Sequence, residues 1–332
     1  MTAASSCELL KSMAEKLLLP EPDFLTMKQS VDGMYEMFKA ITGISCENMN
    51  DQEIILPKGK AISPAAAAHC LLEMKRTTVF LRGIKCAIDS KLHANNSRVE
   101  ILYAGCGPYA TLATPLLSFY TSEQVRVTLL DINPVSIKAA ETLIVSLELE
   151  GYVADYTLAD ASTYQVDKSY DIVISETMQS GLKKEPQVAI MQNLIPQCNS
   201  NTIFIPEQIT IDAYLKKRGI WQGDQLIEEG GKTTHICELF SVSKTRLEAG
   251  SYRKVVDMPQ SLIGPYDLLL YTTIRVFGEE VLSLNDCSLN LPLRYYEFRN
   301  GYPKSIDFWY SQTDNPKIES KVLDYTTNLL TI

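Results

Sequence analysis

Histidine is scarce in this chain, and its cysteines do not form metal-binding pairs. The three histidines, His69, His93 and His235, lie far apart in the sequence, which disfavours a histidine-based metal site. The eight cysteines include no Cys-x-x-Cys pair, and no secretory signal precedes them. We therefore expect reduced thiols, no metal and a cytoplasmic protein.

The sequence also lacks a long apolar run and an excess of positive charge. No apolar stretch approaches the length that crosses a bilayer, so we expect no membrane partner. The net charge of −9 and the pI near 5.0 disfavour nucleic acid as a partner and suit a cationic substrate. With 332 residues, 45% of them hydrophobic, the chain is long enough for two or three compact units.

Two glycines end the clearest strand pattern of the chain. Residues 98–111 contain an apolar strand that stops at Gly105 and Gly107, before a helix of small residues. Such glycines let the backbone approach a ligand, and the helix start offers free N–H groups. A dinucleotide site needs a third glycine, but Pro108 and Tyr109 follow. The turn favours a cofactor without phosphates, such as S-adenosylmethionine; a turn that binds nothing is the alternative.

Strand and helix patterns alternate from residue 98 to residue 200. This alternation predicts a doubly wound α/β sheet, in which ligands bind beyond the carboxyl ends of the strands. One connecting helix is expected at Pro134–Leu149. The expected strands are Val99–Tyr103, Val125–Leu130, Tyr152–Leu158 and Tyr170–Ser175.

An acidic residue follows three of these strands. Asp131 is placed to accept hydrogen bonds from ribose hydroxyls, and Asp160 from an adenine amino group, while Glu176 follows the last strand. Each acid could instead cap a helix, above all Asp131, which precedes Asn133-Pro134. Three in succession favour a ligand site.

A second glutamate lies nine residues after Glu176. One continuous helix would put Glu176 and Glu185 on opposite faces, but Gly181 permits a hairpin-like loop. Pro186 suits the first turn of a new helix, which leaves Glu185 free to point back. Two facing carboxylates match one planar guanidinium. In the alternative interpretation, Glu185 complements a helix dipole and Glu176 pairs with a lysine.

The region before the glycine turn is predicted to be helical. Ser63 and Pro64 are typical of a helix start, and we expect one long helix over Ala65–Ile88. A basic residue on this helix can bind a ligand carboxylate, although a solvated helix face is the alternative. The basic residues in question are Lys75, Arg76 and Arg82.

The first sixty residues contain two helical patterns, Met13–Leu19 and Met27–Ile41, and a loop at Leu56–Gly59. Tyr35 and Phe38 can line a substrate pocket, but aromatic residues on a helix belong more often to the core.

Residues 203–332 lack helical periodicity over most of their length and predict a mostly β domain. Residues 216–235, which contain Gly230-Gly231, are the expected place of an insertion in that domain. The strand patterns are Ile203–Leu215, Ile236–Val242, Leu268–Phe277 and Ile306–Tyr310.

Three stretches of the chain resemble the protein arginine methyltransferases. The Ser-Glu-x-Met start at Ser175, with Glu185 after it, resembles the double-glutamate loop of that family. Arg76-Thr77 with Phe80 stands where the family has Arg-Thr-x-x-Tyr. The segment Asn193–Ala213, which contains Ile203–Pro206, resembles the passage from the last Rossmann helix into the C-terminal β-barrel of the family. The resemblance covers roughly residues 70–215.

This resemblance implies a fold, a cofactor and an assembly. The fold is a Rossmann-like class I methyltransferase domain at 96–200, between an N-terminal helical segment at 1–95 and a mostly β, barrel-like substrate and dimerisation domain at 201–332. The cofactor is S-adenosyl-L-methionine, the product is S-adenosyl-L-homocysteine, and the protein is a homodimer. The implied cofactor-binding residues are Arg76, Gly105, Gly107, Asp131, Asp160, Ala161 and Glu176.

The resemblance also implies a reaction, the methylation of a guanidino nitrogen of arginine. Glu176 and Glu185 are the implied catalytic residues, and the expected substrate-binding residues are Glu176, Met178, Glu185 and Tyr35. The substrate can be free arginine, a small guanidino metabolite or arginine in a peptide. Methyl transfer to an amine or hydroxyl of another metabolite, and a non-catalytic cofactor-binding module, stay open as alternatives.

The chain departs from the family pattern in both halves. Ala104 and Tyr109 stand where the family has an acidic residue and a third glycine. No Thr-His-Trp stretch occurs near the C-terminus, where the family places a histidine beside the glutamates. His235 lies too early to replace it, and Trp309 offers no ring base.

Overall fold

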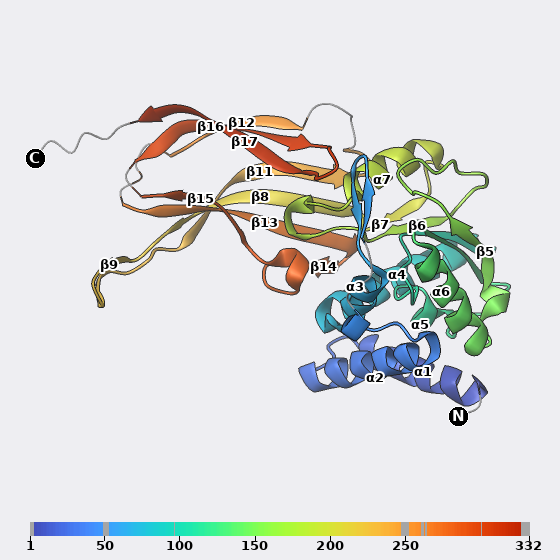
Figure 1. The fold of residues 1–332 in the computed structure, drawn as a ribbon. Coiled ribbons are helices and arrows are strands. Elements are labelled where there is room, and N and C mark those ends of the chain that lie inside the picture. The colour runs from blue at the N-terminus through green and yellow to red at the C-terminus, as the bar shows by residue number, and fades with distance from the viewer. Residues whose placement is uncertain are drawn as a thin grey trace, which may run out of the picture.

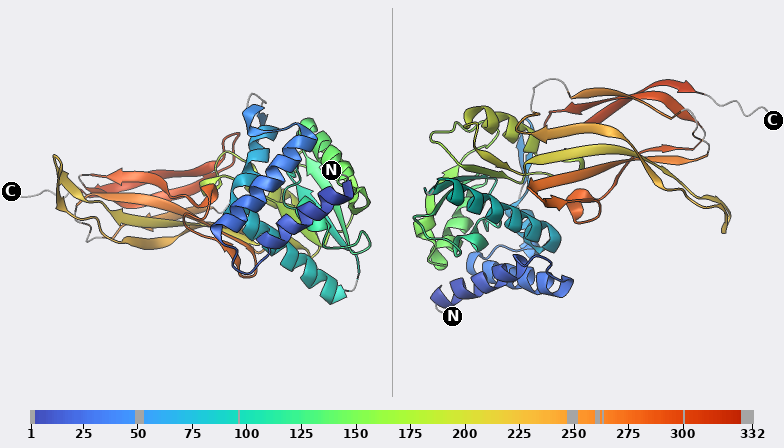
Figure 2. Two further views of the ribbon diagram at one scale, coloured as in Figure 1. Left: turned by 90° about the horizontal axis from the view of Figure 1, so that it is seen from below. Right: turned by 180° about the vertical axis from the view of Figure 1, so that it is seen from behind.

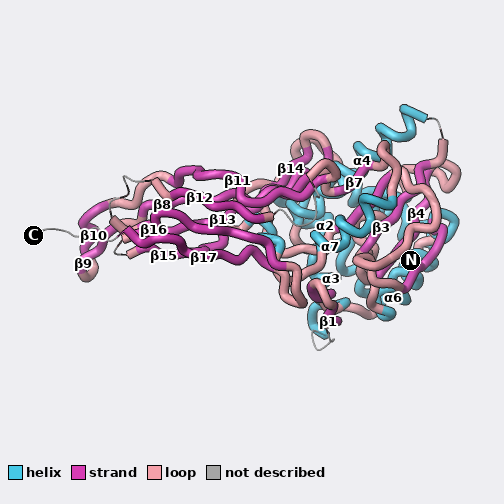
Figure 3. The backbone as a smooth tube through the Cα atoms, turned by 90° about the horizontal axis from the view of Figure 1, so that it is seen from above, coloured by secondary structure: helices cyan, strands magenta, loops and turns pink. Residues whose placement is uncertain are grey.

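The computed structural model describes residues 3–48, 53–95, 97–246, 252–259, 262, 264–299 and 301–326. It has two parts (Figure 1). Helices and a parallel sheet form one part, and long antiparallel strands extend from it to form the other (Figures 2 and 3).

Two amphipathic helices open the chain, as the sequence predicts, but the first covers Ala3–Leu17 instead of Met13–Leu19. Asp23 caps the second helix by accepting a hydrogen bond from the Thr26 N–H at 2.9 Å, and Gly43, with φ of 71°, ends it. This helix packs against the helices of the parallel-sheet part. A short hairpin follows where the sequence predicted only a loop. These elements are α1 (Ala3–Leu17), α2 (Phe24–Thr42), η1 (Cys46–Asn48), β1 (Ile54–Leu56) and β2 (Gly59–Ala61).

The prediction of one long helix over Ala65–Ile88 is wrong, because the helix breaks at Glu73. Ser63 caps the first piece as expected, accepting from the Ala66 N–H at 3.2 Å. Glu73 has ψ of 79°, outside the helical range, and its carboxylate accepts hydrogen bonds from Arg76 and from the backbone N–H of Ser288. The pieces are α3 (Pro64–His69), η2 (Cys70–Leu72) and α4 (Met74–Asn95).

The central sheet has five parallel strands in the order β5-β4-β3-β6-β7. Its inner strands are almost wholly buried, which agrees with their apolar sequences. The strands are β3 (Val99–Ala104), β4 (Val125–Asp131), β5 (Val153–Leu158), β6 (Ile172–Ser175) and β7 (Ile203–Ile205). The connecting helices are α5 (Thr114–Leu117), α6 (Pro134–Ser146), η3 (Glu150–Tyr152), η4 (Ser180–Leu182), α7 (Gln187–Leu194) and η5 (Ile195–Gln197).

The strand order places the predicted site residues side by side. The chain runs outward from β3 through β4 to β5, and then crosses back to β6 on the other side of β3. At the carboxyl end of β3, Ala104 is in register with Leu130 of β4 and Ser175 of β6. The residues that follow these three therefore meet at one edge of the sheet, which is its topological switch point.

The C-terminal part consists of two antiparallel sheets. The first contains β8 (Gln208–Lys217), β11 (Thr233–Ser243), β13 (Tyr266–Phe277), β14 (Glu280–Leu282) and β15 (Leu293–Phe298). The second contains β12 (Arg253–Asp257), β16 (Tyr302–Ser311) and β17 (Lys317–Thr326), and η6 (Ser288–Asn290) precedes β15. The mostly β domain is confirmed. The described strands pair within each sheet and not between the two, so closure into a barrel is not shown.

Two sequence patterns of this part differ in detail from the structure. The pattern Ile203–Leu215 is two strands, because the turn at Pro206 separates β7 from β8. Strand β7 pairs with β6, so the parallel sheet extends beyond residue 200. The expected insertion at 216–235 contains the hairpin β9 (Ile220–Gln222) and β10 (Gln225–Glu228), which projects beyond the end of the sheets (Figure 1).

None of the helices in the described part of the chain is long and apolar enough to span a bilayer.

Candidate functional site

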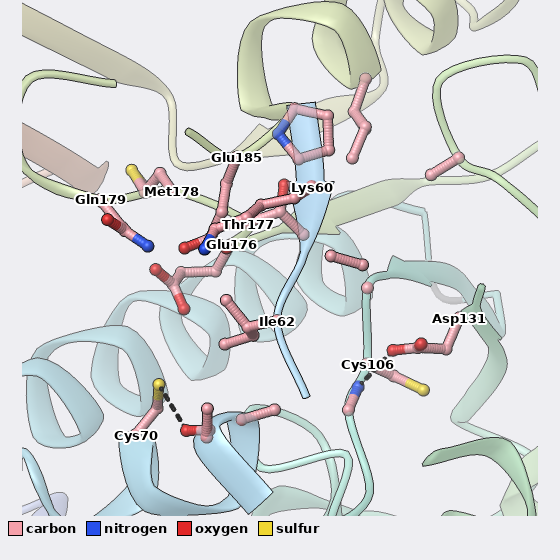
Figure 4. A pocket seen from close by; sticks show the side chains of 18 of the residues that line it. Lys60, Ile62, Cys70, Cys106, Asp131, Glu176, Thr177, Met178, Gln179 and Glu185 are labelled. Carbon is pink, nitrogen blue, oxygen red and sulfur yellow. Dashed lines mark hydrogen bonds between the residues drawn. The ribbon is translucent and has the colours of Figure 1, made fainter. Parts of the chain in front are cut away.

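A cavity of about 500 Å³ lies at the carboxyl ends of β3, β4 and β6 (Figure 4). Its walls come from the parallel sheet, from α3, from the β1–β2 hairpin and from the segment before β15. All the site residues that the family resemblance implies, except Tyr35, line this cavity: Arg76, Gly105, Gly107, Asp131, Asp160, Ala161, Glu176, Met178 and Glu185. The other candidates, Phe38, Lys75 and Arg82, do not line it.

The glycine turn requires glycine for two reasons. Gly105 and Gly107 have φ of 77° and 64°, which other residues rarely adopt. A Cβ atom on Gly105 would also lie 2.4 Å from Thr177 Cγ2, much closer than two carbons can approach. The N–H groups of Gly105 and Cys106 both donate to the Leu130 carbonyl, at 2.8 and 3.1 Å. The turn is therefore fixed between the end of β4 and the glutamate loop.

Asp131 ties this turn to the start of α6. One carboxylate oxygen accepts from the Gly107 N–H and the other from the Asn133 N–H, each at 2.8 Å. Burial raises the pKa of Asp131, while these backbone hydrogen bonds lower it. The helix cap is Asn133, which accepts from the Val135 N–H. Each oxygen of Asp131 retains a second acceptor site, so it can also accept hydrogen bonds from a ligand.

Asp160 and Ala161 line the cavity after β5. Asp160 accepts from the Ser162 N–H at 2.8 Å, and the Asn193 side chain donates to the Ala161 carbonyl at 2.9 Å. The loop after β5 is therefore held by a hydrogen bond from α7, the helix between β6 and β7. That Asp160 accepts a hydrogen bond from adenine and that Ala161 binds the cofactor stay predictions.

Arg76 is 8% exposed and forms ion pairs with two carboxylates. Its Nη1 donates to Glu73 Oε2 at 2.8 Å, and its Nη2 donates to Glu176 Oε2. The solvated-face interpretation of Arg76 is wrong. Glu176 has a cationic partner, as its alternative interpretation required, but the partner is an arginine. That Arg76 meets a cofactor carboxylate stays a prediction.

Both glutamates of the loop are buried and directed toward one space (Figure 4). The Oε1 atom of Glu176 is buried and has no hydrogen-bond partner in the described structure. Burial raises the pKa of Glu176, and Arg76 opposes this rise. For Glu185, burial and the nearby Glu176 raise the pKa to about 7, against smaller effects of Gln179, Arg76 and Lys60. The site therefore contains one ion-paired carboxylate and one that titrates near neutrality.

The glutamate loop is attached to the β domain at several points. Gly181 has φ of 71°, as the predicted hairpin-like turn requires, and its N–H donates to Thr272 Oγ1 at 2.9 Å. Tyr310 donates to the Leu182 carbonyl at 2.7 Å, and the Lys184 N–H donates to the Pro316 carbonyl at 2.8 Å. The new helix expected after Glu185 is confirmed, with Pro186 as its cap residue. The loop geometry thus depends on contacts far away in the sequence.

Tyr35 belongs to the core, not to the site. It is 5% exposed, its hydroxyl donates to Cys46 Sγ at 3.2 Å, and its ring meets the Tyr109 ring edge-on at 6.2 Å. The substrate-binding interpretation of Tyr35 is therefore not supported, and the core alternative describes it. Met178, by contrast, lines the cavity beside Glu176.

Sequence reasoning missed two walls of the cavity. The β1–β2 hairpin contributes Leu56 and Lys60, and the Lys60 N–H donates to the Lys184 carbonyl at 2.8 Å. The only sequence signal was a Pro-Lys-Gly turn between two short apolar runs. The second missed wall comes from the segment before β15, with Ser288, Leu289 and Leu291, and from Leu293, the first residue of β15.

The described lining contains no histidine. No cluster of three or more potential metal ligands occurs among the residues that the structure describes. The positive charges that act on Glu185 are those of Arg76 and Lys60, which lower its pKa.

No protein-family model matches this chain, and no curated protein matches it. Among solved structures, the chain is similar to the Trypanosoma brucei PRMT1 enzyme–prozyme heterotetrameric complex with AdoHcy. The match covers 80% of this chain and 94% of that chain, with a TM-score of 0.53 and 13% sequence identity. The similarity shows a shared fold, in which a Rossmann-like parallel sheet precedes an antiparallel β domain.

Proposed function

We propose that this protein is an S-adenosyl-L-methionine-dependent methyltransferase that acts on a guanidino nitrogen of arginine. The observation that carries the proposal is the pair of buried carboxylates, Glu176 and Glu185, that share one cavity with the glycine turn. The cofactor proposal is supported by the similar PRMT1 structure, which is a complex with AdoHcy.

The cavity has groups that suit each part of this cofactor. Gly105 and Gly107 leave open backbone at the switch point, and Asp131 offers acceptors for ribose hydroxyls. Asp160 and Ala161 lie at the next strand end, where we place the adenine. Arg76, which also pairs with Glu73 and Glu176, is our proposed partner for the carboxylate of the cofactor. When bound, the cofactor would supply an electrophilic methyl group on its sulfonium.

The glutamates would hold the substrate and make it nucleophilic. A guanidinium has a pKa above about 12, and its delocalised lone pairs make it a poor nucleophile. Arg76 fixes one oxygen of Glu176 and leaves the buried Oε1 without a partner, so an N–H donor of the substrate can satisfy it. Charge-assisted bonds to both glutamates concentrate positive charge on the contacted nitrogens and leave the attacking nitrogen richer in electrons.

Glu185 is the proposed proton acceptor. The reaction forms one N–CH₃ bond and breaks one S–CH₃ bond, so a proton must leave the attacked guanidinium. A carboxylate whose pKa is about 7 is a better base near neutral pH than one with the ordinary value. The described cavity has no histidine for this step, so Glu185 both holds the substrate and receives the proton.

Methyl-transfer assays on purified protein test this proposal. The labelled cofactor would be offered with free arginine, an arginine peptide and simple amines, and mass spectrometry would identify the product. Methylation of a guanidino group supports the proposal, and the preferred arginine form defines the substrate. Transfer only to amines or hydroxyls would contradict it. Binding of AdoHcy without transfer to any of them would favour a non-catalytic module.

The glutamate mechanism predicts the effect of one substitution. Glu185→Gln should lower kcat by at least roughly 10²-fold, the size of a general-base contribution, while AdoHcy affinity stays nearly unchanged. The exposed Glu123 provides a control, since Glu123→Gln should leave kcat unchanged. Near-normal turnover in Glu185→Gln would mean that the mechanism is wrong.

We also propose that the protein is a cytoplasmic homodimer. The similar structure is a heterotetrameric complex, which supports assembly in general.

A further inference from the structure

Gln187 is a fully buried polar residue that the mechanism above does not use. It is the first residue of α7, is 0% exposed, and lies two residues after Glu185. Burying an amide costs free energy unless its donors and acceptors are satisfied. A side chain of the same length without polar atoms would fill this position without that cost, so the hydrogen bonds of Gln187 need an explanation.

The amide of Gln187 holds the residues on both sides of Glu176. Its Oε1 accepts from the Thr177 N–H at 2.9 Å and from the Thr177 hydroxyl at 3.0 Å. Its Nε2 donates to the Ser175 carbonyl at 3.0 Å. One side chain therefore links the start of the glutamate loop to its end.

This link also reaches the glycine turn. The methyl group of Thr177 occupies the space that a side chain on Gly105 would need, because a Cβ there would lie 2.4 Å from it. By holding Thr177, Gln187 keeps the glutamate loop packed on the turn. The separation between the two glutamates and their distance from the turn thus depend on the same amide.

We infer that Gln187 is a positioning residue, which sets the spacing of Glu176 and Glu185 relative to each other and to the glycine turn. The inference rests on the proposed function for its effect on catalysis. Its effect on the geometry of the glutamates is independent of any activity.

Gln187→Met tests the inference, because methionine has nearly the same length and no amide. With the glutamates misplaced by about 1 Å, kcat should fall by roughly 10²-fold. Burial and the nearby Glu176 raise the pKa of Glu185 to about 7, and this pKa should fall as the two carboxylates separate. A carbon-13 NMR titration of labelled glutamate carboxyls measures it, with the Glu185 signal assigned by its absence in Glu185→Gln.

Gln197 offers a matched control. Its amide also joins backbone groups, but away from the glutamate loop: it accepts from the Val166 N–H at 3.0 Å and donates to the Tyr164 and Asn193 carbonyls at 3.0 and 2.8 Å. Gln197→Met should lower the Tm as Gln187→Met does, without the loss of kcat or the change in the pKa of Glu185. Equal effects of both variants on these two readouts would overturn the inference, as would an unchanged kcat and pKa in Gln187→Met.

Two further measurements test the inference if Gln187→Met does not fold or if the wild-type protein has no activity. If Gln187→Met does not fold, Thr177→Val keeps the methyl group and the backbone N–H but loses the hydroxyl bond, and a smaller change in the same direction is expected. No change in kcat or in the Glu185 pKa there would overturn the inference. If the wild-type protein methylates nothing, the proposed function fails, but the NMR titration of Gln187→Met still tests the positioning role.

Discussion

At the scale of single residues, Glu185 should make the stability of the protein depend on pH. Its pKa is about 7 in the folded protein and near the ordinary 4.5 in the unfolded chain. Between these values the folded state binds more protons, so the free energy of unfolding falls as the pH rises from 4.5 to 7. The full difference corresponds to about 3 kcal/mol. We expect Glu185→Gln to be more stable than the wild type at pH 8, with little difference at pH 4.5, in urea denaturation.

Besides burial, four side chains act on this titration: Glu176 raises the pKa of Glu185, while Gln179, Arg76 and Lys60 lower it. Glu123→Gln, which changes an exposed carboxyl, is the control and should follow the wild type at both pH values. An advantage of Glu185→Gln that is the same at both pH values would contradict a raised pKa for this residue.

Asp131 is predicted to support both the cofactor site and the glycine turn. Asp131→Ala removes the acceptor for the Gly107 and Asn133 N–H groups, which leaves buried donors without partners. We expect AdoHcy binding, measured by calorimetry, to weaken by roughly 1–3 kcal/mol and the Tm to fall. Asp131→Asn keeps one acceptor oxygen, so its AdoHcy affinity and its Tm should lie between those of the wild type and of Asp131→Ala. An unchanged AdoHcy affinity in Asp131→Ala would place the ribose elsewhere.

The meeting of the glutamates, Asp131 and the glycine turn in one cavity was the part of the site that the sequence predicted best. Gly105, Asp131, Glu176 and Glu185 were recognised because each follows a strand or flanks a turn, and the parallel register brings such positions together. Tyr35 was misjudged as a candidate because helical spacing alone does not tell which buried face meets a cavity.

At the scale of elements, long-range contacts determine two features that the sequence did not predict, the helix break at Glu73 and the β1–β2 hairpin. The helix pattern over Ala65–Ile88 has no strong breaker at Glu73, yet the chain bends there because Glu73 binds Arg76 and the N–H of Ser288, which is more than two hundred residues away. The β1–β2 hairpin was unpredictable for the same reason. Its strands are three residues long and are stabilised by the glutamate loop as well as by each other.

The contact between the β1–β2 hairpin and the glutamate loop gives a prediction. Gly59 has φ of 139°, and a Cβ there would lie 2.9 Å from the Pro186 nitrogen and 3.0 Å from the Glu185 carbonyl carbon. Gly59→Ala should displace the hairpin from Glu185 and raise KM for the guanidino substrate, with a loss of about 1–3 kcal/mol in stability from the strained backbone.

The variant Gly223→Ala separates the effect of backbone strain from the effect of steric contact with the glutamate loop. It also has positive φ, 59°, but no atom lies within 4 Å of a Cβ at that position. Gly223→Ala should therefore lower stability without changing KM. If Gly59→Ala leaves KM at the wild-type value, the hairpin does not shape the substrate site.

At the scale of the whole molecule, the parallel sheet and the mostly β domain followed from periodicity, whereas the arrangement of the β strands did not. Alternating patterns identify strands, but the pairing of β13 with both β8 and β15 joins segments that are not neighbours in the sequence. The strand order and the two-sheet arrangement therefore required the structure. The insertion at 216–235 was located by its turn residues, while its projecting hairpin was not predicted.

This projecting hairpin is our candidate for the contact between two copies of the chain. The β9–β10 hairpin extends beyond the sheets (Figure 1), and Leu226 and Ile227 are 40% and 54% exposed on it. When a partner covers such apolar side chains on a protruding element, the free energy of the system falls. We expect sedimentation velocity at micromolar concentration to show a dimer, and the double variant Leu226→Asp, Ile227→Asp to sediment as a monomer. Leu284→Asp, at a residue 42% exposed outside the hairpin, should remain dimeric. A monomeric wild type would reject the homodimer, and a dimeric double variant would move the contact to another surface.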